Sequence, residues 1–159
     1  MENEEFDFHK IATFADACMR LGISCESLLV DSLGDTEAFL QANAFYKLTI
    51  IQKAINNGKW RDEDGWSYYP YWIRYSKGEM ALMSEAEIQR KGIRQFLSGA
   101  DANNTEIFGV RCAFAYNRSA YTNTPISFPL CFNSQEAAHY AAHQFEDLFF
   151  QYYGIKVKS

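Results

Sequence analysis

The chain has 159 residues, the usual length of one domain, and its 48% of hydrophobic residues is too high for a disordered protein. Its formal net charge of −5 argues against a nucleic-acid binder that relies on a basic surface overall. We expect one domain over residues 1–159, with a helical part at 1–60 and a sheet with a C-terminal helix at 61–159.

The N-terminal sequence and the cysteines indicate a compartment. The first ten residues are acidic and lack the apolar stretch of a secretory signal. No apolar run approaches the roughly 20 residues that cross a bilayer. The four cysteines show no C-x-x-C spacing and are expected to be reduced thiols. We therefore predict a cytoplasmic protein without membrane contact.

Two helices are predicted in the N-terminal part. Apolar residues recur at nearly helical spacing over 11–21, and Gly22 stands where a helix C-cap is expected. A second, longer helix is capped by Asp35 or Thr36 and ends in Asn-Asn-Gly at 56–58. Its apolar residues form a stripe, as in a helix that packs on a core.

An aromatic strand follows at 66–76, where the spacing changes to strict alternation. One parity consists of three tyrosines and one isoleucine: Tyr69, Tyr71, Ile73 and Tyr75. The other parity carries two tryptophans, one tyrosine and one arginine: Trp66, Tyr68, Trp72 and Arg74. Pro70 lacks an N–H donor, which favours an edge strand or a strand start.

Residues 85–98 are ambiguous between helix and strand. Ser84 with Glu87 forms a capping-box pattern, which allows a short helix over 85–91, and 93–97 can form a strand.

Two further strands are expected at 107–118 and 126–132, each with its apolar even-numbered residues turned inward. A closing helix is capped by Asn133 or Ser134 and runs to Gly154. Its apolar stripe is expected to pack on the sheet and comprises Ala137, Ala141, Phe145, Leu148 and Tyr152. The fold class is therefore α+β, with two N-terminal helices, about four antiparallel strands and one C-terminal helix on the sheet.

The aromatic strand is the main candidate for a binding site. Residues 66–118 hold 7 basic and 5 acidic residues, so this segment is mildly basic between acidic flanks. Bases of single-stranded nucleic acid stack on exposed aromatic rings, while arginines bind phosphates or base planes. The candidate nucleic-acid-binding residues are Tyr68, Trp72, Arg74, Arg94 and Arg111. The alternative is a protein-interaction module or small homo-oligomer, in which the same aromatic residues are buried.

Other chemistry is not expected. His139 and His143 are spaced i,i+4, as in zinc sites, and Glu136 or Asp147 is a candidate carboxylate. A zinc site needs three or four ligands. We therefore interpret the two histidines as part of a helix face that is solvated or forms an interface. No nucleophile, phosphate-loop or dinucleotide motif occurs. We predict a non-enzymatic protein without cofactor or metal.

Three stretches carry a resemblance to a family. They are AINNGKW at 54–60, the YYPYW strand at 68–72, and LCFNS at 130–134 followed by an alanine-rich helix. In these stretches the chain resembles an uncharacterised family of small proteins carried by phages and mobile elements of gut bacteria. The order of strands and closing helix is also similar to Whirly and transcriptional-coactivator single-stranded DNA-binding domains. These resemblances imply an accessory role in a phage or mobile element, with single-stranded nucleic acid as the ligand.

Overall fold

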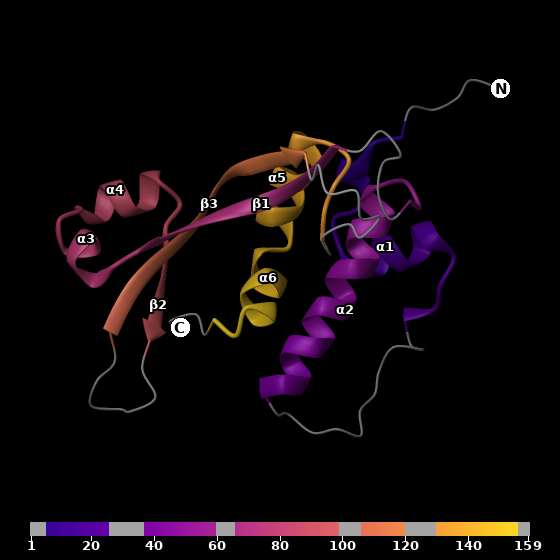
Figure 1. Ribbon diagram of the computed structural model, residues 1–159. Helices are drawn as coiled ribbons and strands as arrows, with labels where there is room; N and C mark the ends of the chain where they lie inside the picture. Colours follow the sequence, from indigo (N-terminus) through magenta and orange to yellow (C-terminus); the bar gives the residue numbers. More distant parts are fainter. Residues whose placement is uncertain (1–5, 26–36, 60–65, 99–105, 120–129, 156–159) are drawn as a thin grey trace.

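The computed structural model describes residues 6–25, 37–59, 66–98, 106–119 and 130–155. These residues form an α+β fold (Figure 1). The helices are η1 (Phe8–Lys10), α1 (Phe14–Leu21), α2 (Glu37–Ile55), α3 (Lys77–Ala81), α4 (Glu85–Arg90), α5 (Gln135–Gln144) and α6 (Glu146–Tyr152). The strands are β1 (Trp66–Tyr75), β2 (Arg94–Ser98) and β3 (Glu106–Ser119).

The elements are arranged in layers (Figure 1). Helices α5 and α6 lie between the sheet and α2, and α1 packs on α2. Helix α3 contacts the sheet at the end remote from α1 and α2, and α4 follows it there. Among the helices that the structure describes, none combines the length and the apolarity that a bilayer crossing requires.

The sheet is antiparallel, with strand order β1-β3-β2. Within the described residues β1 lies at the edge of the three-stranded sheet, which is one of the two positions that Pro70 favours. A bulge shifts the register so that Tyr71 is opposite Phe114 whereas Trp72 is opposite Cys112. The prediction of one uninterrupted inward parity from 108 to 116 is therefore wrong, because the extra residue of a bulge reverses the alternation beyond it.

The prediction of about four strands is also corrected, since the sheet has three strands within the described residues. The first part of the predicted 126–132 strand lies outside those residues. At its end, Phe132 forms an isolated bridge with Tyr68. Leu130 has a φ of 66°, in the left-handed region, and this conformation interrupts the extended backbone that a strand needs.

The C-terminal helix is broken at Phe145, whose φ of −116° and ψ of 28° are not helical. The prediction of one helix to Gly154 is therefore wrong. The predicted burial of Phe145 is confirmed. Helix α5, with Ala137 and Ala141, packs mainly on β1 and β3 as expected, whereas α6 packs mainly on α2, where Tyr152 stacks on Phe45 at 5.3 Å. Phe149 and Phe150 of α6 are turned towards Trp72 of the sheet.

Local capping signals explain most helix boundaries. Gly22 ends α1 with a φ of 66°, as predicted, and Thr13 begins it with a capping box. Ser84 caps α4 as its sequence pattern predicts, which resolves 85–98 as a helix followed by a strand. Ser76 caps the short helix α3, which the sequence interpretation missed. The caps predicted for α2 lie outside the described residues.

Candidate ligand-binding surface

The face of the sheet that meets α6 is closed by aromatic packing. The Trp72 ring lies 5.1 Å from the ring of Phe150 and 5.7 Å from that of Phe149. Phe96 meets Phe150 edge to face at 4.8 Å, and all three phenylalanines are almost fully buried. Trp72 is thus part of the core, which places its indole between the sheet and α6.

Arg94 lies on the same face and is held by α6. Its Nη1 donates to Glu146 at 3.0 Å and to Asp147 at 2.5 Å, and its guanidinium lies over the ring of Phe150. Burial alone would lower the pKa of Arg94, but its hydrogen bonds to Asp147 and Glu146 raise it above the ordinary value. Two carboxylates around one guanidinium leave a local negative charge, which does not favour a phosphate.

Tyr68 and Arg74 share this face by register. Tyr68 is half-buried against the central core and bridges Phe132 through the backbone. Arg74 is exposed and pairs with Val110 of β3. On the other side of β3, Val110 pairs with Arg94 of β2. Four of the five predicted site residues therefore belong to the face that α5 and α6 occupy.

The opposite face of the sheet carries a row of tyrosines on β1. Tyr71 is 43% exposed, while Tyr69, Ile73 and Tyr75 are half-buried. Arg111 is on this face, where its Nε donates to the hydroxyl of Tyr75 at 2.8 Å. This hydrogen bond positions the guanidinium beside the tyrosine row, so the four β1 residues and Arg111 form what we call the tyrosine face.

One end of the tyrosine face is covered by α3. A Cβ on Gly109 would lie 2.5 Å from Ile93 Cγ2 and 2.5 Å from Met80 Sδ, and both of these side chains are buried. Glycine is therefore required here for α3 to pack directly on β3. Positions 67, 69, 71, 73, 75, 95, 109 and 111 of this face hold no acidic residue.

The structure brings together one predicted site residue, Arg111, with tyrosines that the sequence interpretation did not select. Tyr69, Tyr71 and Tyr75 are the other parity of the same aromatic strand, so the alternating pattern contained the signal. It did not reveal which parity the helices cover.

The three stretches that carry the family resemblance meet in space. Asn56 donates from Nδ2 to the carbonyl of Cys131 and accepts from the N–H of Asn133. Gln52 donates to the same Cys131 carbonyl at 2.6 Å, while Phe132 pairs with Tyr68 of β1. The buried side-chain amides of Gln52 and Asn56 thus satisfy backbone groups of residues 131 and 133, as a neighbouring strand would. These contacts give the motifs a structural role.

A pocket of about 400 Å³ lies between the start of α2 and α6. Its lining is mostly apolar, with Leu40, Leu148 and Phe150 among its residues. Its charged groups among the described residues are the carboxylates of Glu37 and Asp147. Such a pocket does not favour an anion, in contrast to the tyrosine face.

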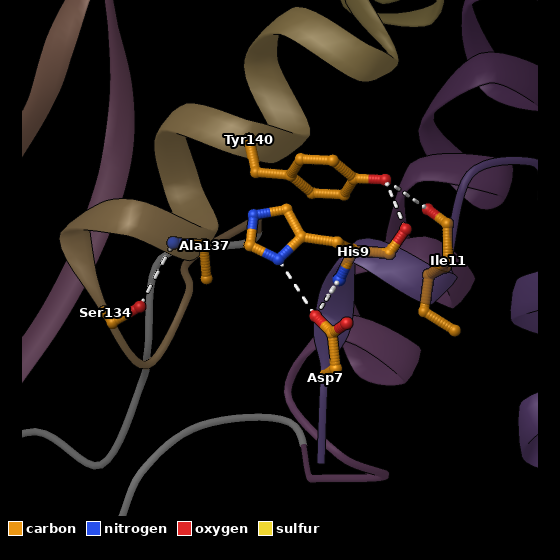
Figure 2. A network of polar contacts seen from close by, with 6 residues as sticks. All are labelled: Asp7, His9, Ile11, Ser134, Ala137 and Tyr140. Atoms are coloured by element: carbon orange, nitrogen blue, oxygen red, sulfur yellow. Dashed lines mark hydrogen bonds and ion pairs between the residues drawn. The ribbon is translucent and has the colours of Figure 1, made fainter. Parts of the chain in front are cut away.

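Several reactive groups among the described residues are engaged in structure. Burial raises the pKa of Cys112 and of Cys131 to about 11, so both thiols stay protonated at neutral pH. Asp7 accepts hydrogen bonds from the N–H of His9 and contacts its ring Nδ1, and Tyr140 donates to the carbonyls of His9 and Ile11 (Figure 2). These contacts attach the N-terminal segment to α5.

Among the described side chains, no group of three or more His, Cys, Asp or Glu is arranged to hold a metal ion. Comparison with known proteins finds no matching family model, no matching curated protein and no matching solved structure.

Proposed function

We propose that this chain is a non-enzymatic accessory protein of phage or mobile-element type that binds single-stranded nucleic acid on its tyrosine face. The observation that carries the proposal is the tyrosine row of β1 with Arg111 beside it, on the side of the sheet away from α5 and α6.

The chemistry of the tyrosine face suits unpaired bases. Each base presents a flat ring that stacks on an aromatic side chain, with a gain of about 1–3 kcal/mol per base. Tyr71 offers the most exposed ring of the row, and Arg111 supplies a guanidinium for a phosphate or a base plane. The absence of acidic residues at these strand positions lessens, next to the tyrosine row, the repulsion that the net charge of −5 produces.

The second candidate is a protein partner, including a second copy of this chain. It is favoured by Ile73 within the tyrosine row and by the acidic net charge. Tyrosine and arginine around an apolar side chain are also typical of the centres of protein interfaces. Both candidates use the same surface, so one set of variants separates them.

The test is fluorescence anisotropy of labelled single-stranded DNA and RNA oligonucleotides, titrated with the full chain at low salt. Tyr71→Ala removes one stacking ring and is expected to weaken binding by about 5–150-fold. Arg111→Met is expected to lower the slope of log affinity against log salt by about 1.

Tyr46→Ala is the matched control. Tyr46 is 38% exposed, close to the 43% of Tyr71, but it lies on α2 rather than on the sheet. It should leave oligonucleotide binding unchanged. Absence of binding at low salt, where phosphate contacts are strongest, would rule out the nucleic-acid proposal. Light scattering on the same variants then tests the self-association form of the second candidate, which Tyr71→Ala should weaken.

A further inference from the structure

Helix α5 is fixed on several sides, and it carries two histidines on its exposed surface. Four alanines of α5 are buried in the interior: Ala137, Ala138, Ala141 and Ala142. Ser134 caps the helix by accepting from the N–H of Ala137, and the Tyr140 hydroxyl reaches the N-terminal segment (Figure 2). Gln144 donates to the carbonyl of Ala12 at 2.8 Å. The backbone that presents His139 and His143 is therefore held in place.

The Nε2 atoms of the two imidazoles lie close together. Nε2 of His139 and Nε2 of His143 are 3.2 Å apart, and their rings are inclined at 61°. A zinc ion lies about 2.0–2.1 Å from an imidazole nitrogen, so two such ligands are about 2.9 Å apart at a right angle and about 3.4 Å apart at the tetrahedral angle. The observed separation falls between these two values without any change of side-chain conformation.

We propose that His139 and His143 chelate one divalent transition-metal ion through their Nε2 atoms. The ion would replace the direct contact between the two Nε2 atoms. Partial desolvation and the neighbouring His143 lower the pKa of His139, which favours the neutral, metal-binding form of its imidazole.

The ligand set decides the class of ion. Two imidazoles suit borderline ions such as Zn²⁺, Ni²⁺ and Cu²⁺, whereas Mg²⁺ and Ca²⁺ require oxygen ligands. Asp147, which the sequence suggests as a carboxylate ligand for this site, forms an ion pair with Arg94. Because no group of three side-chain ligands exists among the described residues, water occupies the remaining coordination positions. The site is therefore an open chelate, unlike a closed structural zinc site.

Isothermal titration calorimetry of the full chain with Zn²⁺ at pH 7.5 tests the proposal. We expect one ion per chain, and His139→Ala and His143→Ala should each abolish the heat of binding. Both side chains are exposed, so the variants should keep the wild-type circular dichroism spectrum. Binding should weaken as the pH falls, because protons compete with the metal ion for imidazole nitrogens.

Two control variants test competing ligands. His9→Ala removes the other histidine, which is exposed and paired with Asp7, and Cys25→Ser removes a partly exposed thiol. Both variants should bind Zn²⁺ like the wild type. The proposal would be overturned if the wild type does not bind Zn²⁺, or if His139→Ala and His143→Ala bind it as tightly as the wild type does. Loss of binding in either control variant would also overturn it.

Discussion

The two faces of the sheet share the residues of strand β1 but have different surroundings. Along β1, Trp72 is packed between the strands and α6, whereas its neighbour Tyr71 is 43% exposed on the other side. Both parities are rich in aromatic residues, and both include or adjoin an arginine. The difference is that Arg94 is held by two carboxylates of α6, while Arg111 is held by the neutral hydroxyl of Tyr75.

Aromatic content alone therefore does not identify a binding surface. A ring that fills the core contributes stability through its buried area, and it is not available to a ligand. An arginine between carboxylates has its charge compensated, whereas one beside a hydroxyl keeps its charge for an anion. The location of the helices and the acids therefore separates a structural face from a candidate binding face.

The largest effect is expected from Phe150→Ala. Phe150 is 1% exposed and contacts Trp72, Phe96 and the guanidinium of Arg94. Its loss should lower the free energy of unfolding by about 3–5 kcal/mol, because the cavity lies at the centre of the sheet–helix contact. Urea denaturation measures this change. The matched change on the tyrosine face, Tyr71→Ala, should cost less than about 1 kcal/mol, and equal costs would refute the contrast between the faces.

A smaller effect is expected where α3 covers the end of the tyrosine face. Gly109→Ala would place a methyl group against Met80 and Ile93, and overpacking of this kind costs about 1–3 kcal/mol. Thermal and urea unfolding both report it. Gly78→Ala within α3 is the control, since the nearest atom to its new Cβ is 4.0 Å away and alanine favours a helix by about 1 kcal/mol. A neutral Gly109→Ala would show that α3 does not pack closely on β3.

The smallest effect on stability is expected from Arg94→Met. Its side chain is 34% exposed, so solvent screens its ion pairs, and their loss should cost about 1 kcal/mol. The cost should shrink in 1 M salt, which weakens ion pairs in the wild type. Oligonucleotide binding should stay unchanged in Arg94→Met but fall in Arg111→Met. Weaker binding in Arg94→Met with unchanged binding in Arg111→Met would indicate that the binding site lies on the face that α6 covers.

Local sequence patterns predicted much of the fold. The capping box at Ser84, the glycine after Leu21 and the alternation over 66–76 each depend on residues a few positions apart. Their outcomes are set by backbone hydrogen bonds and steric preferences that act within one element. Helix α3 was missed although Ser76 and Glu79 form the same kind of capping box, because the segment is too short to show an apolar period.

The candidate site was only half predictable for a related reason. Alternation in β1 shows that residues divide into two sets, and both sets here are aromatic. Choosing between them requires the position of α5 and α6, which is fixed by contacts with α2 more than 80 residues away in the chain. Tyr71 was therefore passed over in favour of Trp72.

The sequence by itself determined helices α1 and α2 and the burial of Phe145, because periodicity and caps are local properties. The tertiary structure alone decided the bulge opposite Tyr71, the break at Phe145 and the face that the helices cover. These features arise where long-range packing outweighs local preference. The gain from burying both Phe149 and Phe150 favours a broken helix that fills the space between the sheet and α2.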